Sequence, residues 1–290
     1  MKRIAFIGTS FSSALVAQMM IDSGASVVFF EKGTYGGAWG EAPIARRKAP
    51  RFNNVVFPYD EKQEASLPNL HEKLVSMGAQ VHLVNQEFQS VSEYKPDQII
   101  AGNFFPAIKK VISHKSASVR RTRARELRVH SSSVQVNGEF FDYAVLPFNA
   151  KVMVYGLAGP NSGPQKLSWD DNQSEHVRIL WSNRQVGKIY CEEQDAIFDR
   201  FGFLPGPTPV FIGRVRRELK GNTAENLAKA SIITHSRLAE ARKMDIQRFR
   251  QRRLTPDSRL ELQEQTLGTR LRILDTSDLL SSMDCSRDWL

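Results

Sequence analysis

The N-terminal stretch, residues 1–40, constrains the fold more than any other part of the chain. Lys2–Gly8 is a short apolar run that ends in glycine, and Thr9–Met20 has the apolar spacing of a helix. Ser26–Phe30 is a second apolar run, and Glu31 closes it. A strand, a tight turn, a helix and a strand that ends in an acid follow the order of a nucleotide-binding βαβ unit. The sequence therefore predicts an α/β fold built on a parallel sheet.

The turn after Gly8 suits a phosphate group, because the free N–H groups and the dipole at a helix N-terminus attract negative charge. Where Gly-x-Gly-x-x-Gly is usual, the chain reads Gly8-Thr-Ser10-Phe-Ser-Ser13. Ser13 is small enough for close packing of the helix on the strand, whereas the Cβ of Ser10 crowds an approaching phosphate. We expect the Ser10 hydroxyl to donate a hydrogen bond to the phosphate, and Glu31 to accept hydrogen bonds from a ribose.

A double glycine, Gly36-Gly37, follows the acid, and Ala38 and Trp39 come next. This pattern resembles the second half of the FAD signature in the superfamily of amine oxidases, protoporphyrinogen oxidases and UDP-galactopyranose mutases. The resemblance implies a Rossmann-like FAD/NAD(P)-binding domain that binds FAD. It places Glu31 and its neighbour Lys32 at the ribose, the double glycine along the diphosphate, and Trp39 beside the flavin. A role for Trp39 as an ordinary core aromatic stays open.

Two later segments extend the resemblance. Gly138–Asn149 resembles the family's strand that returns the chain to the nucleotide-binding sheet. Pro209–Arg214 resembles its late strand, which would bring Gly213 and Arg214 to the ribityl–pyrophosphate region. A long helix then opens at Gly221-Asn222-Thr223, and in the family its N-terminus points at the flavin, which places Asn222 and Thr223 at the cofactor. The chain is identified as a divergent and shortened relative of this superfamily.

The resemblance also suggests how the chain is divided. The expected parts are 1–100, the first part of the dinucleotide-binding domain; 101–205, inserted strands and a small mixed substrate region that includes the return strand 140–149; 206–245, the last strand and helix of that domain; and 246–290, a C-terminal arm. Short apolar runs predict strands that share one mostly parallel sheet, at 2–8, 26–30, 80–84, 143–147 and 209–213. Helices are expected at 61–78, with Leu67, Leu70, Leu74 and Val75 on its apolar face, and at 103–112. Asn137-Gly138 predicts a hairpin.

The formal net charge of +9 is concentrated in a basic segment, residues 109–128, and in a second one, residues 248–253. A solvated face explains such segments, and so does an anionic substrate or a partner protein. Nucleic acid is not favoured, because no helix-turn-helix, RRM or zinc pattern accompanies the charge. The role of segment 109–128 stays open.

Cys191 and Cys285 lie far apart and lack metal-ligand spacing, so we expect no disulfide framework, no metal site and a reducing compartment. No apolar run approaches the length of a membrane span. An N-terminal signal peptide is rejected, because cleavage near Ala17 would remove the first strand. We therefore expect a cytoplasmic protein.

Three functions remain open. The first is an FAD-dependent oxidoreductase that acts on an amine or another small organic metabolite. The second is a mutase-like flavoenzyme that acts on a UDP-sugar. The third, which Ser10 favours, is a non-catalytic relative that serves as a binding or assembly partner, with the C-terminal arm as a contact for a partner or a second copy. No catalytic residue is assigned, because a flavin carries the hard chemistry itself.

Overall fold

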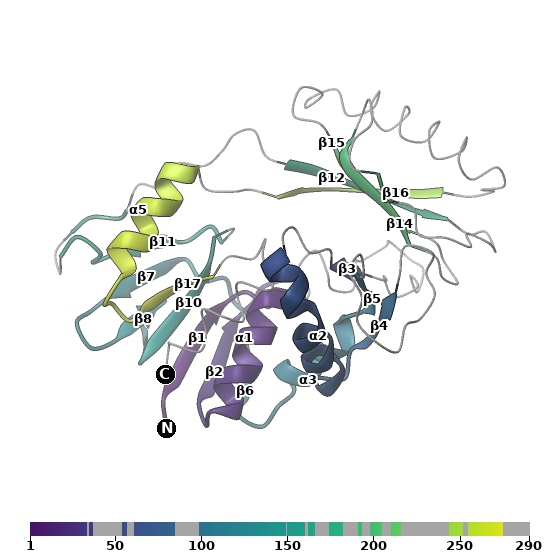
Figure 1. Cartoon of the computed structure of the whole chain (residues 1–290). Helices are drawn as coiled ribbons and strands as arrows, with labels where there is room; N and C mark the ends of the chain where they lie inside the picture. Colours follow the sequence, from purple (N-terminus) through teal and green to yellow (C-terminus); the bar gives the residue numbers. More distant parts are fainter. Residues whose placement is uncertain are drawn as a thin grey trace.

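The computed structural model describes the chain in thirteen stretches: residues 1–33, 35–36, 54–56, 61–84, 99–148, 150–159, 162–165, 174–181, 191–192, 198–204, 210–215, 244–251 and 255–274. They form a parallel sheet with helices on one face and a second sheet on the other, and a separate antiparallel sheet stands beside this unit (Figure 1). The predicted α/β, Rossmann-like fold is confirmed.

The parallel sheet has the strand order β17-β10-β1-β2-β6, and every neighbouring pair is parallel. Its strands are β1 (Arg3–Ile7), β2 (Ser26–Phe30), β6 (Ala117–Arg120), β10 (Tyr143–Pro147) and β17 (Leu271–Leu274). Because all five run in one direction, their carboxyl ends meet at a single edge. That edge is where an open parallel sheet binds its ligand.

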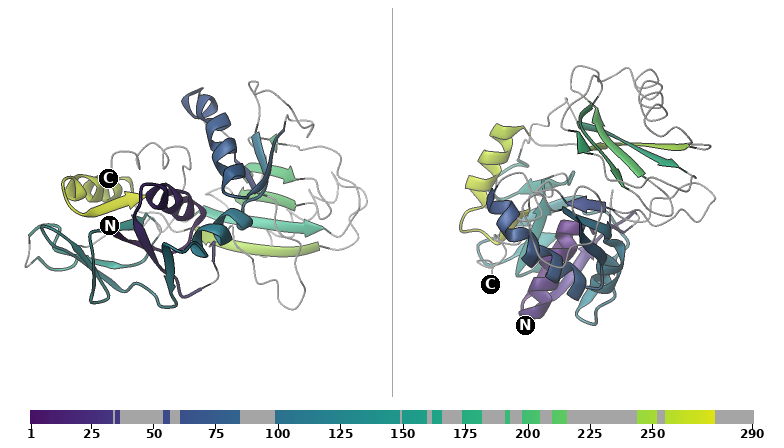
Figure 2. Two further views of the ribbon diagram at one scale, coloured as in Figure 1. Left: turned by 90° about the horizontal axis from the view of Figure 1, so that it is seen from below. Right: turned by 45° about the vertical axis from the view of Figure 1, so that its right-hand side comes forward.

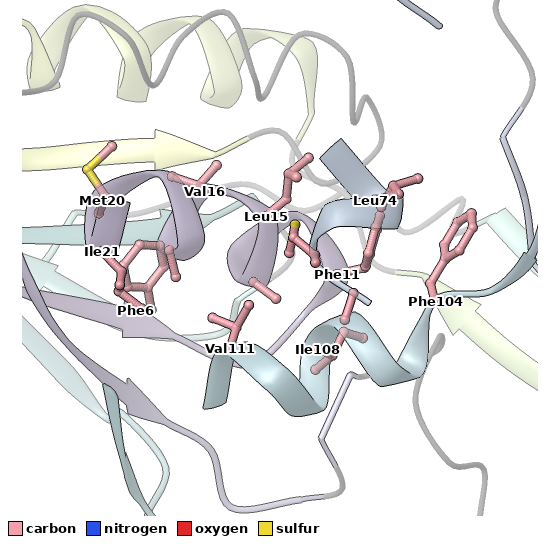
Figure 3. Close-up of a cluster of buried hydrophobic side chains, with 14 of the residues drawn as sticks. Phe6, Phe11, Leu15, Val16, Met20, Ile21, Leu74, Phe104, Ile108 and Val111 are labelled. Atoms are coloured by element: carbon pink, nitrogen blue, oxygen red, sulfur yellow. The ribbon is translucent and has the colours of Figure 1, made fainter. Parts of the chain in front are cut away.

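The two faces of the parallel sheet bury different side chains, as the period of two along a strand requires. Ile4 and Phe6 of β1 point to the helices, and Ala5 and Ile7 point to the opposite layer. Three helices cover the first face: α1 (Phe11–Asp22), α2 (Glu61–Ser76) and α3 (Phe105–Ile112). Figure 3 shows this core, in which the Phe11 and Phe104 rings stack with centroids 4.8 Å apart.

Helix α1 is buried on nearly all sides, because it packs on β1 and β2, contacts α3 beside it, and shares one buried cluster with residues of α2. Leu15, Val16 and Ala17 are all fully buried although they point in successive directions around the helix. This explains why the segment lacks a polar stripe. The burial fixes the helix firmly, so its N-terminus keeps a constant position at the edge of the sheet.

The opposite face of the sheet is covered by the meander sheet, which has the order β11-β7-β8-β9. Its strands are β7 (Glu126–Val129), β8 (Val134–Val136), β9 (Glu139–Phe141) and β11 (Met153–Tyr155). Leu127, Val136 and Phe141 pack from it onto the parallel sheet, together with Leu262 of α5 (Pro256–Thr266).

The predicted Asn137-Gly138 hairpin joins β8 to β9 and is confirmed by positive φ angles at both residues, +50° and +90°. The Asn137 side chain also holds the segment that links β6 to β7. Its Oδ1 accepts a hydrogen bond from the Arg125 N–H at 2.8 Å, and its Nδ2 donates one to the Arg123 carbonyl at 2.9 Å. The hairpin therefore fixes the arginine-rich segment that follows β6.

Two further sheets are antiparallel. A small sheet has the order β3-β5-β4, from β3 (Asn54–Val56), β4 (Gln80–Val84) and β5 (Ile99–Asn103). A larger one has the order β13-β14-β15-β12-β16, and Figure 2 shows it apart from the parallel sheet. Its strands are β12 (Ser174–Trp181), β13 (Cys191–Glu192), β14 (Phe198–Leu204), β15 (Val210–Val215) and β16 (Met244–Gln251).

Two of the five runs expected in the parallel sheet belong elsewhere. Residues 80–84 form β4 in the small sheet, and residues 210–213 of the other run lie in β15 of the large antiparallel sheet. Their places are taken by β6 and by β17, which lies in the segment expected to be a C-terminal arm. An apolar run predicts a strand but not its neighbour, and this is why the prediction of a shared sheet was wrong for these two runs.

The helix expected at 61–78 is confirmed as α2, and the short helix at 103–112 as α3. Leu67, Leu70 and Leu74 are fully buried against α1, as predicted. Val75 is 48% exposed and does not join that face. The long helix expected after Gly221 lies outside the described residues, and so does the segment that follows Leu274. Of the helices that the structure describes, none is long and apolar enough to cross a lipid bilayer.

Candidate functional site

The candidate site lies where the carboxyl ends of β1, β2 and β6 meet the N-terminus of α1. Gly8 makes the turn from β1 into α1 with a φ of +92°, a conformation that strongly favours glycine. Its N–H donates to the Phe30 carbonyl at 3.0 Å, which ties the turn to the end of β2. The prediction that Gly8 forms the sharp turn is confirmed.

The N-terminus of α1 is capped by Ser10. Its Oγ accepts a hydrogen bond from the Ser13 N–H at 3.1 Å and lies 2.8 Å from the Ser13 Oγ. Ser10 thus occupies one of the backbone donors that a helix N-terminus offers to an anion. The first turn of α1 contains no acidic residue, so its positive dipole end is not opposed from within the helix.

Glu31, at the end of β2, is fixed by three hydrogen bonds. Its Oε2 accepts from both the N–H and the hydroxyl of Thr9, each at 3.1 Å, and its Oε1 accepts from the Gly33 N–H at 2.7 Å. The carboxylate therefore points toward the turn that follows β1. It is half-buried, with lone pairs left for the hydroxyls of a ligand.

The segment after Glu31 folds back over the turn. Gly36 donates its N–H to the Thr9 Oγ1 at 3.0 Å and pairs with Ser10 in a parallel bridge. The first glycine of the double-glycine pattern is thus brought against the N-terminus of α1. A backbone that runs beside a helix N-terminus, without a side chain at the point of contact, leaves room for a diphosphate.

Arg121, which follows β6, holds the same segment from the other side. Its Nη1 donates to the Gly33 carbonyl at 3.3 Å, and its guanidinium lies over the Tyr35 ring at 4.1 Å from the centroid. The backbone joins the two elements as well, because the Glu31 N–H donates to the Arg120 carbonyl at 3.0 Å. Arg121 therefore contacts the loop that contains the ribose-binding candidate Glu31.

The other predicted site residues divide into three groups. Lys32 is exposed beside Glu31. Gly37, Trp39, Asn222 and Thr223 lie outside the described residues. Gly213 and Arg214 lie in β15, paired with Val177 and His176 of β12 in the large antiparallel sheet. The basis for placing them at the cofactor was a strand in the parallel sheet, and the structure removes that basis.

Sequence reasoning missed Thr9, Tyr35 and Arg121. Thr9 is fully buried and contacts both Glu31 and Gly36, although it stands at the variable position of the glycine motif. Its polar side chain between two small residues was the available signal. Arg121 lies 88 positions after Gly33, and only the pairing of β2 with β6 brings the two together.

An ion-pair network joins the meander sheet to the parallel sheet. Glu139 of β9 pairs with Arg3 of β1 and, at 3.2 Å, with Arg120 of β6. The hydrogen bond from Arg120 lowers the pKa of Glu139; burial opposes this, and Arg3 adds to the lowering. Arg121 and Arg123, the next basic residues along the chain, take no part in this network and are exposed.

Comparison with known proteins supports the fold. No protein family model matches the chain, and no curated protein matches it in sequence. Among solved structures, an FAD-dependent oxidoreductase from Pseudomonas aeruginosa is similar, with a TM-score of 0.58 at 13% identity over 99% of this chain and 88% of that one. The flavin-dependent halogenase CmlS gives a TM-score of 0.54 at 12% identity and covers 97% of this chain.

A third similar structure is 2-methyl-3-hydroxypyridine-5-carboxylic acid oxygenase, with a TM-score of 0.51 at 11% identity over 99% of this chain and 82% of that one. This chain spans 55% of the length of the halogenase. Likeness at such low identity shows the fold alone, a Rossmann-like α/β fold that these three flavin-dependent proteins share with this chain. It does not distinguish the amine oxidase-like superfamily from the oxygenases and halogenases.

Proposed function

We propose that this chain binds FAD at the carboxyl edge of the parallel sheet and acts as an FAD-dependent oxidoreductase on a small organic molecule. The observation that carries the proposal is the convergence of three separate segments: the turn at Gly8, the acid Glu31 and the glycine Gly36. Each matches one part of a dinucleotide, namely the diphosphate at the helix N-terminus, the ribose, and the close passage of the backbone.

The residues proposed to hold the cofactor are Gly8, Ser10, Ser13, Glu31, Lys32 and Gly36, with Gly37 and Trp39 following in the sequence. They fit FAD on the evidence of the cradle itself, because the first turn of α1 contains no acidic residue and the residue that pairs with Ser10 is the glycine Gly36. When bound, the flavin supplies hydride and electron transfer. The protein contributes binding, orientation and a positive dipole end.

An amine, or another small organic metabolite, is the substrate class proposed from the sequence resemblance. A cytoplasmic location is a separate proposal from the sequence. The mutase-like alternative gains no specific observation. The oxygenase and halogenase among the structural neighbours widen the range of reactions to be assayed. An amine oxidase assay is therefore the first to run, with hydroxylation and halogenation assays as comparisons.

One observation favours the non-catalytic alternative. The Ser10 side chain already satisfies the Ser13 N–H, which in a nucleotide-loaded unit is a donor near the phosphates. A protein that had lost its cofactor would retain the fold and keep this cap. The two candidates therefore differ in whether FAD binds at the α1 N-terminus at all.

The visible absorbance of the purified protein, followed by a titration with FAD, tests the proposal. We expect flavin absorbance, or saturable quenching of FAD fluorescence when the colourless protein is titrated. A protein that is colourless and shows no saturable binding of FAD contradicts the flavoenzyme and leaves the binding or assembly role.

A further inference from the structure

We infer that Thr9 and Arg121 are positioning residues that form a two-sided clamp on the segment Glu31–Gly36 and preorganise it for the adenosine half of the nucleotide. The inference rests on the proposed function, because it names how that same site recognises its ligand. It concerns neither a group that contacts the reacting atoms nor the flavin ring.

Thr9 forms one side of the clamp from beneath the segment. Its hydroxyl donates to Glu31 Oε2 and accepts from the Gly36 N–H, so one buried oxygen joins both ends of the segment. The Thr9 N–H adds a second bond to the same carboxylate oxygen. Both hydrogen bonds of the hydroxyl are made in a fully buried place, where an unmade bond is costly.

Arg121 forms the other side and acts on the middle of the segment. It donates to the Gly33 carbonyl and lies over the Tyr35 ring. Gly33 also donates to Glu31 Oε1, so Arg121 and Glu31 hold the same residue through its two backbone groups. Glu31 is thus restrained at both carboxylate oxygens.

The position of Arg121 is itself fixed. It directly follows β6, which pairs with β2 up to Phe30 and Arg120. Beyond it, the Asn137 side chain binds the backbone of Arg123 and Arg125. A guanidinium carried on a segment restrained at both ends loses less freedom when it holds a partner, which is the condition for a preorganised site.

This arrangement predicts how affinity divides between the parts of the cofactor. The clamp acts on the ribose carboxylate and on the glycine at the diphosphate, so it favours ligands that contain adenosine diphosphate. ADP alone is expected to bind and to compete with FAD. FMN lacks the adenosine half and is expected to bind at least about tenfold more weakly than FAD, because it cannot use the hydrogen bonds of Glu31.

The test is a titration of FAD, ADP and FMN against the full chain and four variants. Thr9→Val removes the hydroxyl while it keeps nearly the same side-chain shape, and Thr9→Ser keeps the hydroxyl. Arg121→Ala removes the guanidinium that forms the other side of the clamp, and Arg123→Ala is its matched control. Arg123 is exposed in the same segment, and no contact of its side chain is present in the part that the structure describes.

Thr9→Val and Arg121→Ala are each expected to weaken both FAD and ADP by about five- to twentyfold, in line with the loss of one or two hydrogen bonds. Thr9→Ser and Arg123→Ala are expected to bind within about twofold of the parent chain. The weak binding of FMN should not change in any variant, and this readout separates positioning from a general loss of structure. Far-ultraviolet circular dichroism and melting temperature establish that each variant is folded.

Three outcomes decide the inference. Equal affinity of the parent, Thr9→Val and Arg121→Ala for ADP and FAD overturns the clamp while the cofactor proposal stands. Failure of FAD to bind, with ADP still bound and weakened by both substitutions, overturns the flavin assignment while the clamp stands. Failure of both ligands to bind the parent chain overturns both. Arg121 is exposed, so Arg121→Ala keeps the test valid even if Thr9→Val does not fold.

Discussion

Gly8 is the residue whose backbone conformation makes the turn from β1 into α1. An added Cβ there meets the Glu31 carboxylate at an ordinary 3.8 Å, so space does not exclude alanine, but the φ of +92° does. Gly8→Ala is therefore expected to lower the free energy of unfolding by about 1–3 kcal/mol, the cost of a strained backbone. Urea denaturation measures it, with Gly163→Ala as the control, because Gly163 has no neighbour within 4 Å and no positive φ. Equal losses in the two variants would show that the turn is not strained.

Glu31 is the residue on which nucleotide affinity is expected to depend most. Glu31→Gln removes the charge while it keeps the side-chain length, and charge-assisted hydrogen bonds contribute about 1.5–3 kcal/mol each. FAD affinity should fall about ten- to a hundredfold, measured by fluorescence quenching. Glu72→Gln, an exposed acid on α2, should leave the affinity unchanged. An unaltered affinity of Glu31→Gln at constant fold would remove Glu31 from the site.

At the scale of the element, α1 has two competing uses for its N-terminus. Ser10 caps it, and a bound diphosphate would use the same donors. Ser10→Ala should cost about 1 kcal/mol of stability and Ser10→Gly only a few tenths, because glycine is an acceptable cap.

FAD affinity is the second property in which a Ser10 variant should differ from the parent. Ser10→Gly is expected to bind FAD as tightly as the parent or more tightly, since a Cβ no longer crowds the phosphates. Thermal melts with and without FAD measure both quantities. If neither the parent nor Ser10→Gly gains stability from FAD, the flavin assignment fails.

The strands whose place in the parallel sheet was predicted from the sequence differ in their surroundings from the two whose place was not, β6 and β17. β1, β2 and β10 are apolar runs bounded by turn or helix signals, and these were placed in the right sheet. β17 has only four residues, one of them Arg272, and β6 has the exposed Arg120 at its end. Their sheet membership depends on partners far away in the sequence. The site follows the same rule: Gly8, Ser10 and Glu31 belong to a local motif, whereas Arg121 reaches the site only through the pairing of β2 with β6.

At the scale of the whole molecule, Glu139 links two layers and gives stability a pH dependence. Its folded pKa is lowered from an ordinary value of 4.5, so its contribution is fully present above that value and is lost as pH falls through the lower folded pKa. Asp22 acts in the same direction: burial opposes ionisation, but hydrogen bonds from Lys73 and Gln18 outweigh it and lower the pKa.

Glu139→Gln should therefore melt at a lower temperature than the parent at pH 7, and the two melting curves should converge in acid. Differential scanning calorimetry between pH 7 and about pH 3 measures the gap in melting temperature between the two proteins. This gap should shrink in acid, because protonation of Glu139 weakens its ion pairs in the parent. Glu264→Gln is the control, as an exposed acid that forms no ion pair within the described segments. A gap between Glu139→Gln and the parent that persists at low pH would contradict the assignment.

The order β17-β10-β1 has a consequence for how the protein is made on the ribosome. β10 is synthesised beside an already emerged β1, but its other neighbour, β17, follows on the order of a hundred residues later. At typical rates of synthesis that interval is on the order of ten seconds, during which one side of β10 has no hydrogen-bonding partner. An unpaired strand side is a place where a nascent chain associates with another. A chaperone that shields β10 would then raise the yield of folded protein, and a translational pause before β17 would lower it.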